Sequence, residues 1–581
     1  MEFKKFRGVI FWLIGYLVLL SGFIVWVVSY DSQQIKEQLI FVSPLILEIN
    51  FYLILIGFII NIKIFREVAK TITRKTWIIV FLITLGGIVL TAVVAPRTHR
   101  VFHDEDIYLN QGQNIAFLEK AGMCSEGGNL FGEYFCGRLE YNKEPNGWPF
   151  LLSILYRLFG VSHTAAFLLN NVFWGLSGFI VFWIGYLLFR NINAGLFASL
   201  IFVLAPEGIR WSNTTAAEPS TALLGGLAVF AVLLFIRYPG NKTLFQASVI
   251  LPFACQFRPE SILLTIPACL ALLLLVPQGF ARRRFYGFIF IVLFLLLPHF
   301  IHLFTVKGQA WGASDGVKFG LHYLKDNVSV NSLFYFRNVR FPLLFSLFFL
   351  MGIVCPGSNK PNNGLPRGKL SVFLFIKEKT ILIGWFMAFW GIFLFFYAGS
   401  YNYGTDVRFS LMSYFPLAIL AGYGMASICG WFENWFDITW LDKGLVALVI
   451  VSFLPFMPYI RAETQEAWGA RVGHQFAKEI VDILPAHSLV LTHNPNMFLV
   501  WGKDAAQTAT ALYGKEYMDS LFNRYRGGVY FHYNYWCNID DLEQKAFCQT
   551  VLDLYPVNEI KSYQELNYKF GLYRMLPKGP E

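Results

Sequence analysis

Charged side chains are scarce in this sequence of 581 residues. Asp, Glu, Lys and Arg together make up 14% of it, whereas hydrophobic residues make up 56%. Soluble domains carry about 25% charged residues. Apolar runs of roughly 17 to 25 residues recur along the chain, and each is long enough to cross a hydrocarbon core about 30 Å thick. The sequence therefore predicts a polytopic α-helical membrane protein and excludes an ordinary soluble enzyme.

The sequence also has no excess of acidic residues, and its formal net charge is +10. In a membrane protein, basic residues report the topology before they report any binding to nucleic acid. Length and apolarity predict about thirteen spans. They lie near residues 8–30, 41–64, 77–95, 162–189, 194–207, 219–237, 243–257, 260–277, 286–306, 340–355, 380–398, 409–430 and 443–460.

Basic residues also predict the orientation. Lys4, Lys5 and Arg7 precede the first span, which is too long for a secretion signal and is interpreted as a retained anchor. Later basic clusters fall in alternate connections, as the positive-inside rule requires. We therefore expect the N-terminus in the cytoplasm and the first long connection, residues 96–161, outside. A bacterial or archaeal cell membrane is the favoured location.

The composition changes at about residue 461, where apolar runs shorten and polar residues return. Residues 488–502 have the pattern of a strand followed by a turn, residues 527–536 that of a strand, and residues 465–484 that of an amphipathic helix. About 120 residues are enough for a small domain. The sequence therefore predicts a C-terminal extracytoplasmic α/β domain over residues 461–581.

Four of the 8 cysteines fall in the segments expected outside. Cys124 and Cys136 share the first outer connection, and Cys537 and Cys548 share the C-terminal domain. Two local pairs in an oxidising compartment favour two disulfides. The alternative is four free thiols.

Four ionisable residues stand side by side in the first outer connection: His103, Asp104, Glu105 and Asp106. A carboxylate beside an apolar wall has a raised pKa unless a cation is near, which suits a general base. A neighbouring acid can bind a metal ion or the acceptor. The alternative is a solvated acidic turn that caps a helix, and the residues alone leave both interpretations open.

Two basic residues follow on the same predicted outer face. Lys143 lies further along the first outer connection, and Arg258 stands in an Arg-Pro-Glu turn with Glu260. Arginine pairs with phosphate through a planar fork and stays charged. Charged residues at membrane depth are functional candidates. The alternatives are a snorkelling Lys143 and a structural pair between Arg258 and Glu260.

A third basic residue, Arg408, opens a late span beside Tyr403 and Asp406. It could complete a phosphate site, or it could pair with Asp406 within an interfacial aromatic belt. Acids, two arginines, a lysine and aromatic residues are thus all predicted on one face. Such a site suits an enzyme that takes a group from a phosphate lipid and passes it to an acceptor outside the membrane.

The order of these motifs resembles that of the GT-C membrane glycosyltransferases, in the branch of the protein O-mannosyltransferases and the aminoarabinose transferase of lipid A. The acidic motif of the family is matched by Asp104-Glu105, its Lys/His-x-Pro-Pro-Leu-like stretch by residues 143–151, its Arg-Pro-Glu by residues 258–260 and its late Arg-aromatic motif by residues 408–416. The resemblance spans about residues 77–460. The second proline of the loop motif is replaced, and the two spans before residue 77 are additional.

The resemblance implies an inverting transfer from a polyprenyl- or dolichyl-phosphate sugar. Asp104 would be the general base or position the acceptor, and Glu105 would support it or help to hold a metal ion. Lys143, Arg258 and Arg408 would grip the donor phosphate and stabilise it as a leaving group. The supporting residues would be His103, Asp106, Glu260 and Tyr403. A divalent cation, Mg²⁺ or Mn²⁺, is the one cofactor considered, with Asp104 and Glu105 as its ligands.

The sequence thus predicts a glycosyltransferase that acts on a protein, lipid or glycan acceptor at the outer face. Residues 1–76 would form two additional spans and a cytoplasmic loop, and residues 77–460 the catalytic core. One alternative is a ligase or polymerase of lipid-linked glycans, which relies on outer arginines and histidines. Another is a transporter or flippase, but transporters usually show inverted repeats and midplane charges. This sequence has no internal repeat.

Overall fold

The structure, a computed structural model, contains two compact units. Unit 1 comprises Met1–Arg97, Lys143–Gly147 and Phe167–Ala462, and unit 2 comprises Thr98–Asn142, Trp148–Ala166 and Glu463–Glu581. The structure describes residues 2–101, 103–130, 132–276, 283–308, 313, 316–337, 339–355, 369–401, 404–436, 440–462, 468–538 and 542–577.

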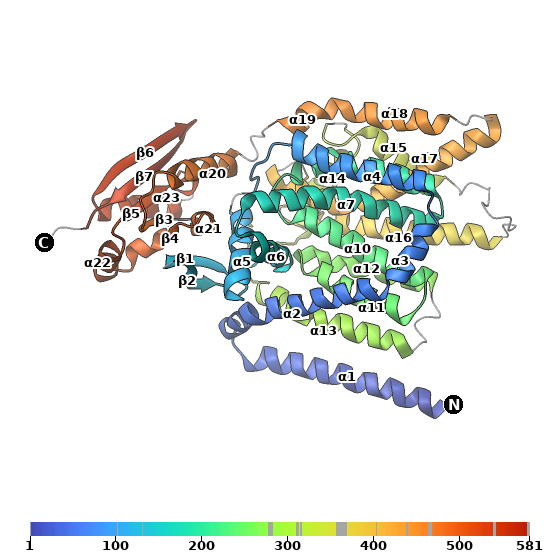
Figure 1. Cartoon of the computed structure of the whole chain (residues 1–581), viewed down its shortest axis with the longest axis horizontal. Coiled ribbons are helices and arrows are strands. Elements are labelled where there is room, and N and C mark those ends of the chain that lie inside the picture. The colour runs from blue at the N-terminus through green and yellow to red at the C-terminus, as the bar shows by residue number, and fades with distance from the viewer. Residues whose placement is uncertain are drawn as a thin grey trace. The chain divides into compact units, whose positions relative to one another are not determined.

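Unit 1 is built from helices (Figure 1). They are α1 (Glu2–Ser29), α2 (Ser32–Ile60), α3 (Ile62–Lys70), α4 (Arg74–Val89), η1 (Leu90–Val94), α7 (His163–Phe189, in this unit from Phe167), α8 (Ile192–Val203), α9 (Pro206–Trp211), α10 (Glu218–Arg237), α11 (Asn241–Cys255), η2 (Pro259–Leu264), α12 (Thr265–Leu275), α13 (Arg283–Thr305), η4 (Leu321–Tyr323), α14 (Leu324–Phe334), α15 (Leu343–Val354), α16 (Lys369–Ile392), η5 (Gly404–Ser413), α17 (Tyr414–Phe436), α18 (Leu441–Phe453), η6 (Leu454–Phe456) and α19 (Met457–Arg461).

Seven helical segments of the described residues are long and apolar enough to cross a membrane. They are Ser32–Ile60, Arg74–Val94, His163–Phe189, Glu218–Arg237, Phe285–Thr305, Asp406–Phe436 and Leu441–Arg461. Shorter apolar helices include Ile192–Val203, Pro259–Leu275 and Leu343–Val354. The predicted class, a helical membrane protein, is confirmed, and the count of about thirteen spans stays a prediction.

Small residues let the helices of unit 1 approach one another closely. A Cβ atom added to Gly422 of α17 would lie 2.3 Å from the backbone nitrogen of Ala198 in α8. A Cβ atom added to Gly424 would lie 2.3 Å from the carbonyl oxygen of Phe348 in α15. Helices in lipid associate through such close packing, because lipid tails are as apolar as the side chains. Helix α17 is therefore held tightly between α8 and α15.

Unit 2 contains a seven-stranded sheet in the order β2-β1-β4-β3-β5-β7-β6. The strands are β1 (Met123–Leu130), β2 (Glu133–Glu140), β3 (Ser488–Thr492), β4 (Asp504–Gln507), β5 (Gly528–Tyr533), β6 (Val557–Glu565) and β7 (Tyr568–Met575). The helices are α5 (Asp104–Leu118), α6 (Gly147–Phe159, in this unit from Trp148), α20 (Trp468–Val481), α21 (Pro495–Val500), η8 (Thr508–Leu512), α22 (Lys515–Arg524), η9 (Tyr535–Cys537) and α23 (Leu542–Leu554).

The centre of the sheet is parallel, and its flanks are antiparallel. β3 pairs in parallel with β4 and β5, with Leu489 opposite both Asp504 and Val529. Parallel strands are usually covered on both faces and are apolar throughout. Leu489 and Leu491 of β3 pack into a core with α22 and α23, whereas Val490 packs into a core with α20 and α21. The predicted C-terminal sheet domain is confirmed.

The first long connection, residues 96–161, which is predicted to lie outside, supplies two strands to this sheet. β1 pairs antiparallel with β4, with Glu126 opposite Ala506. β1 and β2 form a hairpin that a disulfide between Cys124 and Cys136 crosses. A second disulfide joins Cys537 of η9 to Cys548 of α23. The acidic motif, which opens α5, thus belongs to the same unit as the C-terminal segment.

Loss of the second disulfide should destabilise unit 2. Its cysteines are 11 residues apart and fully buried, so Cys537→Ser with Cys548→Ser should lower the free energy of unfolding by about 3 kcal/mol. Pulse proteolysis of the full-length protein in urea, followed through a C-terminal tag, measures this. Cys269→Ser, which removes an exposed free thiol of α12, is the control. Equal urea midpoints for the double variant and the control would contradict the prediction.

Candidate active site

The predicted site residues fall into two groups, one in each unit. His103, Asp104, Glu105 and Asp106 belong to unit 2, and Lys143, Glu260, Arg258 and Arg408 belong to unit 1. Tyr403 lies outside the described residues. Each group is described within its own unit.

The acidic motif forms the first turn of α5. Asp104, Glu105 and Asp106 all lie in that turn, where the unpaired N–H groups of a helix favour negative charge. The residue before the helix, His103, has φ 74°, in the left-handed region that costs a non-glycine residue about 1–3 kcal/mol. Its Nε2 lies 3.0 Å from the carbonyl oxygen of His493, which fixes the ring.

Glu105 closes the turn that leads into α5. Its Oε1 accepts hydrogen bonds from the backbone nitrogens of Arg100 at 2.6 Å and Val101 at 2.8 Å, and its side chain is fully buried. Buried carboxylates are normally satisfied by such donors. This geometry suits a residue that positions the preceding loop.

Asp106 is buried in a different environment, among imidazoles. Its Oδ2 accepts a hydrogen bond from Nδ2 of Asn494 at 2.7 Å. Its Oδ1 lies 3.7 Å from Nδ1 of His99 and 3.8 Å from Nε2 of His474. Burial raises the pKa of Asp106 to about 7, and the hydrogen bond from Asn494 opposes that shift. Asp104, by contrast, is only half-buried.

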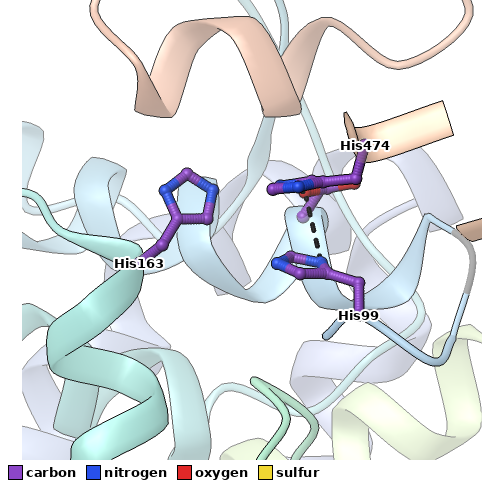
Figure 2. Close-up of side chains that lie close together, drawn as sticks. His99, His163 and His474 are labelled. Carbon is purple, nitrogen blue, oxygen red and sulfur yellow. Dashed lines mark ion pairs between the residues drawn. The ribbon is translucent and has the colours of Figure 1, made fainter. Parts of the chain in front are cut away.

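Three histidines that no sequence motif indicated, His99, His163 and His474, gather around Asp106. The rings of His99 and His474 stack with centroids 4.0 Å apart, and the ring of His163 lies beside them (Figure 2). Burial lowers the pKa values of His99 and His474 well below the usual value for histidine. These residues come from the loop before α5, the start of α7 and α20, so no local sequence pattern could have indicated them.

In unit 1, Arg258 and Arg408 meet on one carboxylate. Oε1 of Glu218, the first residue of α10, accepts a hydrogen bond from Nη1 of Arg258 and lies 3.0 Å from Nε of Arg408. The side chain of Glu218 is 2% exposed. The structure thus brings together two of the predicted phosphate ligands, and it adds an acid that sequence reasoning missed.

Further contacts orient the two guanidinium groups. Nε of Arg258 donates to Oε1 of Glu260, which is the pair considered as an alternative from the sequence. The ring of Phe409 lies under both guanidinium groups, 5.2 Å from that of Arg258 and 5.1 Å from that of Arg408. Trp211 contacts the Arg408 group at 6.0 Å. Aromatic faces stabilise cations in this arrangement.

A second buried ion pair lies on α9 of the same unit. Nη1 of Arg210 is 3.5 Å from Oε1 of Glu207, which also accepts a hydrogen bond from the hydroxyl of Tyr459. The Arg210 guanidinium stacks over the Tyr459 ring at 4.2 Å. Sequence reasoning missed this pair as well. Polar residues on an apolar helix were its only signal.

The loop that carries Lys143 packs against the turn that carries Arg258. The backbone nitrogen of Gly147 donates to the carbonyl oxygen of Gln256 at 2.9 Å. A Cβ atom at Gly147 would lie 2.6 Å from that oxygen, so only glycine permits this approach. Lys143 itself is half-buried, and its backbone contacts His302 of α13.

Comparison with known proteins gives a match to one family model. A family model described as dolichyl-phosphate-mannose-protein mannosyltransferase matches residues 143–302, which include Lys143 and Arg258. No curated protein matches the chain.

Similar solved structures have low sequence identity. ArnT from Cupriavidus metallidurans bound to undecaprenyl phosphate is 13% identical with a TM-score of 0.50, covering 88% of this chain and 100% of that chain. Its apo state is 13% identical with a TM-score of 0.50, covering 85% and 97%. The Archaeoglobus fulgidus oligosaccharyltransferase in complex with Zn and sulfate is 12% identical with a TM-score of 0.47, covering 85% and 72%.

The matched family model and the fold shared with ArnT both indicate the GT-C superfamily. The GT-C fold predicted from the order of the motifs is therefore confirmed, and the family match over residues 143–302 agrees with the predicted class.

Removal of the Glu218 charge should destabilise unit 1. Glu218→Gln leaves two guanidinium groups without their shared counter-charge in an apolar surrounding, and breaking a buried ion pair costs about 3–5 kcal/mol. The apparent melting temperature in detergent, read from the monodisperse fraction after heating, should fall by several degrees. Glu67→Gln, at an exposed acid of α3, should melt like the wild type. If the Glu218→Gln variant has the same melting temperature as this control, Glu218 does not stabilise unit 1 by balancing the two arginines.

Proposed function

We propose that the protein transfers a sugar from a polyprenyl-phosphate donor to an acceptor at the outer face of the membrane. Arg258 and Arg408 carry this proposal, because they converge on the buried Glu218 within one unit. The matched family model supports a lipid-phosphate sugar as the donor. The fold shared with ArnT, which was solved bound to undecaprenyl phosphate, supports the same donor chemistry.

The two arginines suit the departure of a lipid phosphate. Each guanidinium presents its N–H donors in a planar fork, the geometry that matches phosphate oxygens. As the bond between sugar and phosphate breaks, negative charge grows on the phosphate, and fixed donors in an apolar surrounding stabilise it strongly. Glu218 balances the arginines before the donor binds, and Lys143 would add a third cation.

Asp104 is the proposed general base for the acceptor. Among the three acids of the motif, Glu105 accepts two backbone hydrogen bonds and Asp106 faces histidines. Asp104 is half-buried at the start of α5, so it is the acid best suited to meet an acceptor group. A Mg²⁺ or Mn²⁺ ion, if the reaction uses one, would bind Asp104 more readily than Glu105.

The orientation proposed from the basic residues places the site and unit 2 outside, with the N-terminus in the cytoplasm. The two disulfides of unit 2 support this placement, because disulfides persist in oxidising compartments. Unit 2, which carries Asp104, would then meet the acceptor, whether that is a protein, a lipid or a glycan.

Replacing either arginine by lysine should impair donor turnover. Arg258→Lys and Arg408→Lys keep the charge but lose the planar fork, so kcat/KM for the donor should fall about 100-fold. Release of polyprenyl phosphate from a panel of polyprenyl-phosphate sugars measures this, with the full-length protein in liposomes and membrane extract as a source of acceptor. Arg66→Lys, at an exposed position of α3, is the matched control. Unchanged kcat/KM in both site variants would exclude these arginines from the donor site.

Asp104→Asn should strongly reduce the rate of transfer while the donor still binds. Loss of a general base costs about 100- to 10,000-fold in kcat. The same assay measures kcat, and equilibrium binding of a radiolabelled donor measures affinity. Glu119→Gln, at the exposed far end of α5, should retain full activity. Full transfer by Asp104→Asn would return the acidic motif to a purely structural role.

A further inference from the structure

Four side chains of unit 2 offer ligand atoms to a common point. One atom from each of His99, Asp106, His163 and His474 lies within 4.8 Å of the other three. The three labelled imidazoles face a shared space (Figure 2). A second group, His493 with Cys537 and Cys548, is unsuitable because its two sulfur atoms form a disulfide.

The distances are close to those of a tetrahedral metal site. Bonds of about 2.0–2.1 Å place tetrahedral ligand atoms about 3.4 Å apart. Here Oδ1 of Asp106 lies 3.7 Å from Nδ1 of His99 and 3.8 Å from Nε2 of His474. The imidazole rings of His99 and His474, which stack with centroids 4.0 Å apart, would turn out of this stack so that a nitrogen of each points at the ion.

Three of the four residues in this cluster, Asp106, His163 and His474, have a buried polar atom without a hydrogen bond among the described residues. Within the part of the chain that the structure describes, Oδ1 of Asp106, Nε2 of His163 and Nε2 of His474 are buried and form no hydrogen bond. Buried polar atoms are rarely left so, and a metal ion is one explanation when they are. Asp106 and His474 also line a small cavity with His99, Asn494 and His532, and it has room for about one water molecule or one ion.

The ligand types select the metal. Three imidazoles and one carboxylate suit Zn²⁺, whereas Mg²⁺ prefers oxygen ligands alone.

We propose that unit 2 contains a structural Zn²⁺ site formed by His99, Asp106, His163 and His474. With four protein ligands the site is closed, as structural zinc sites are. It links the loop before α5, the first turn of α5, the start of α7 and α20. The C-terminal segment is thereby tied to the acidic motif, whichever sugar the enzyme moves. The site is distinct from the Mg²⁺ or Mn²⁺ site considered at Asp104 and Glu105.

Metal analysis of the purified full-length protein tests this proposal. After treatment with a chelator, the protein is loaded with Zn²⁺ alone and gel-filtered, and zinc per chain is measured by mass spectrometry. We expect about one Zn²⁺ per wild-type chain, and at least 100-fold weaker binding by His163→Ala and His474→Ala. His487→Asn, at an exposed histidine of the same unit, should bind as the wild type does.

Absorption spectroscopy with Co²⁺ and the melting temperature with Zn²⁺ test the proposal even if a histidine variant fails to fold. Co²⁺-loaded wild type should show the intense visible absorption of four-coordinate cobalt, and Asp106→Asn, which is nearly isosteric, should lose it. Zn²⁺ should raise the apparent melting temperature of the wild type, and the chelator should reverse the gain. Wild type that retains no zinc, or the weak absorption of six-coordinate cobalt, overturns the proposal. So does equal zinc binding by folded His163→Ala and His474→Ala.

Discussion

The candidate donor site depends on the ion pairs that the buried carboxylate of Glu218 forms with two arginines. A guanidinium group in an apolar surrounding is costly unless it is paired and hydrogen-bonded. Glu218 contacts Arg258 from the turn after α11 and Arg408 from η5, so one acid joins three separate segments. Two guanidinium cations can therefore lie side by side before a phosphate group binds. Their closeness, unfavourable for two isolated cations, is what a phosphate leaving group requires.

Close backbone packing positions this ionic cluster. Gly147 fits against the carbonyl group of Gln256, two residues before Arg258, and Gly422 and Gly424 let α17 settle between α8 and α15. Because Arg408 lies in η5, directly before α17, the packing of α17 also limits where its guanidinium can lie. The positions of the two arginines thus depend on apolar and glycine contacts that take no part in the proposed reaction.

In unit 2, three consecutive acids have three different environments. Glu105 is bound by the backbone N–H groups of Arg100 and Val101, and Asp106 faces His99 and His474 in the protein interior. Asp104 remains half-buried at the start of the helix. Successive side chains on a helix point about 100° apart, so neighbours in sequence meet different surroundings. This separation allows one short motif to supply a proposed base, a loop anchor and a proposed metal ligand.

The sequence by itself determined the class of the protein and much of its layout. Long apolar runs require spanning helices because lipid cannot satisfy backbone polar groups. The order of the motifs around Asp104, Arg258 and Arg408 predicted the GT-C fold, which the similarity to ArnT confirms, and the family match over residues 143–302 agrees with it. Only the tertiary structure showed that Glu218 joins the two arginines, that a hairpin from the first connection completes the C-terminal sheet, and that His99, His163 and His474 surround Asp106. Local sequence patterns reflect whether a segment faces water or lipid. The contacts named above join residues that are far apart in the chain, so only the packing of the folded chain brings them together.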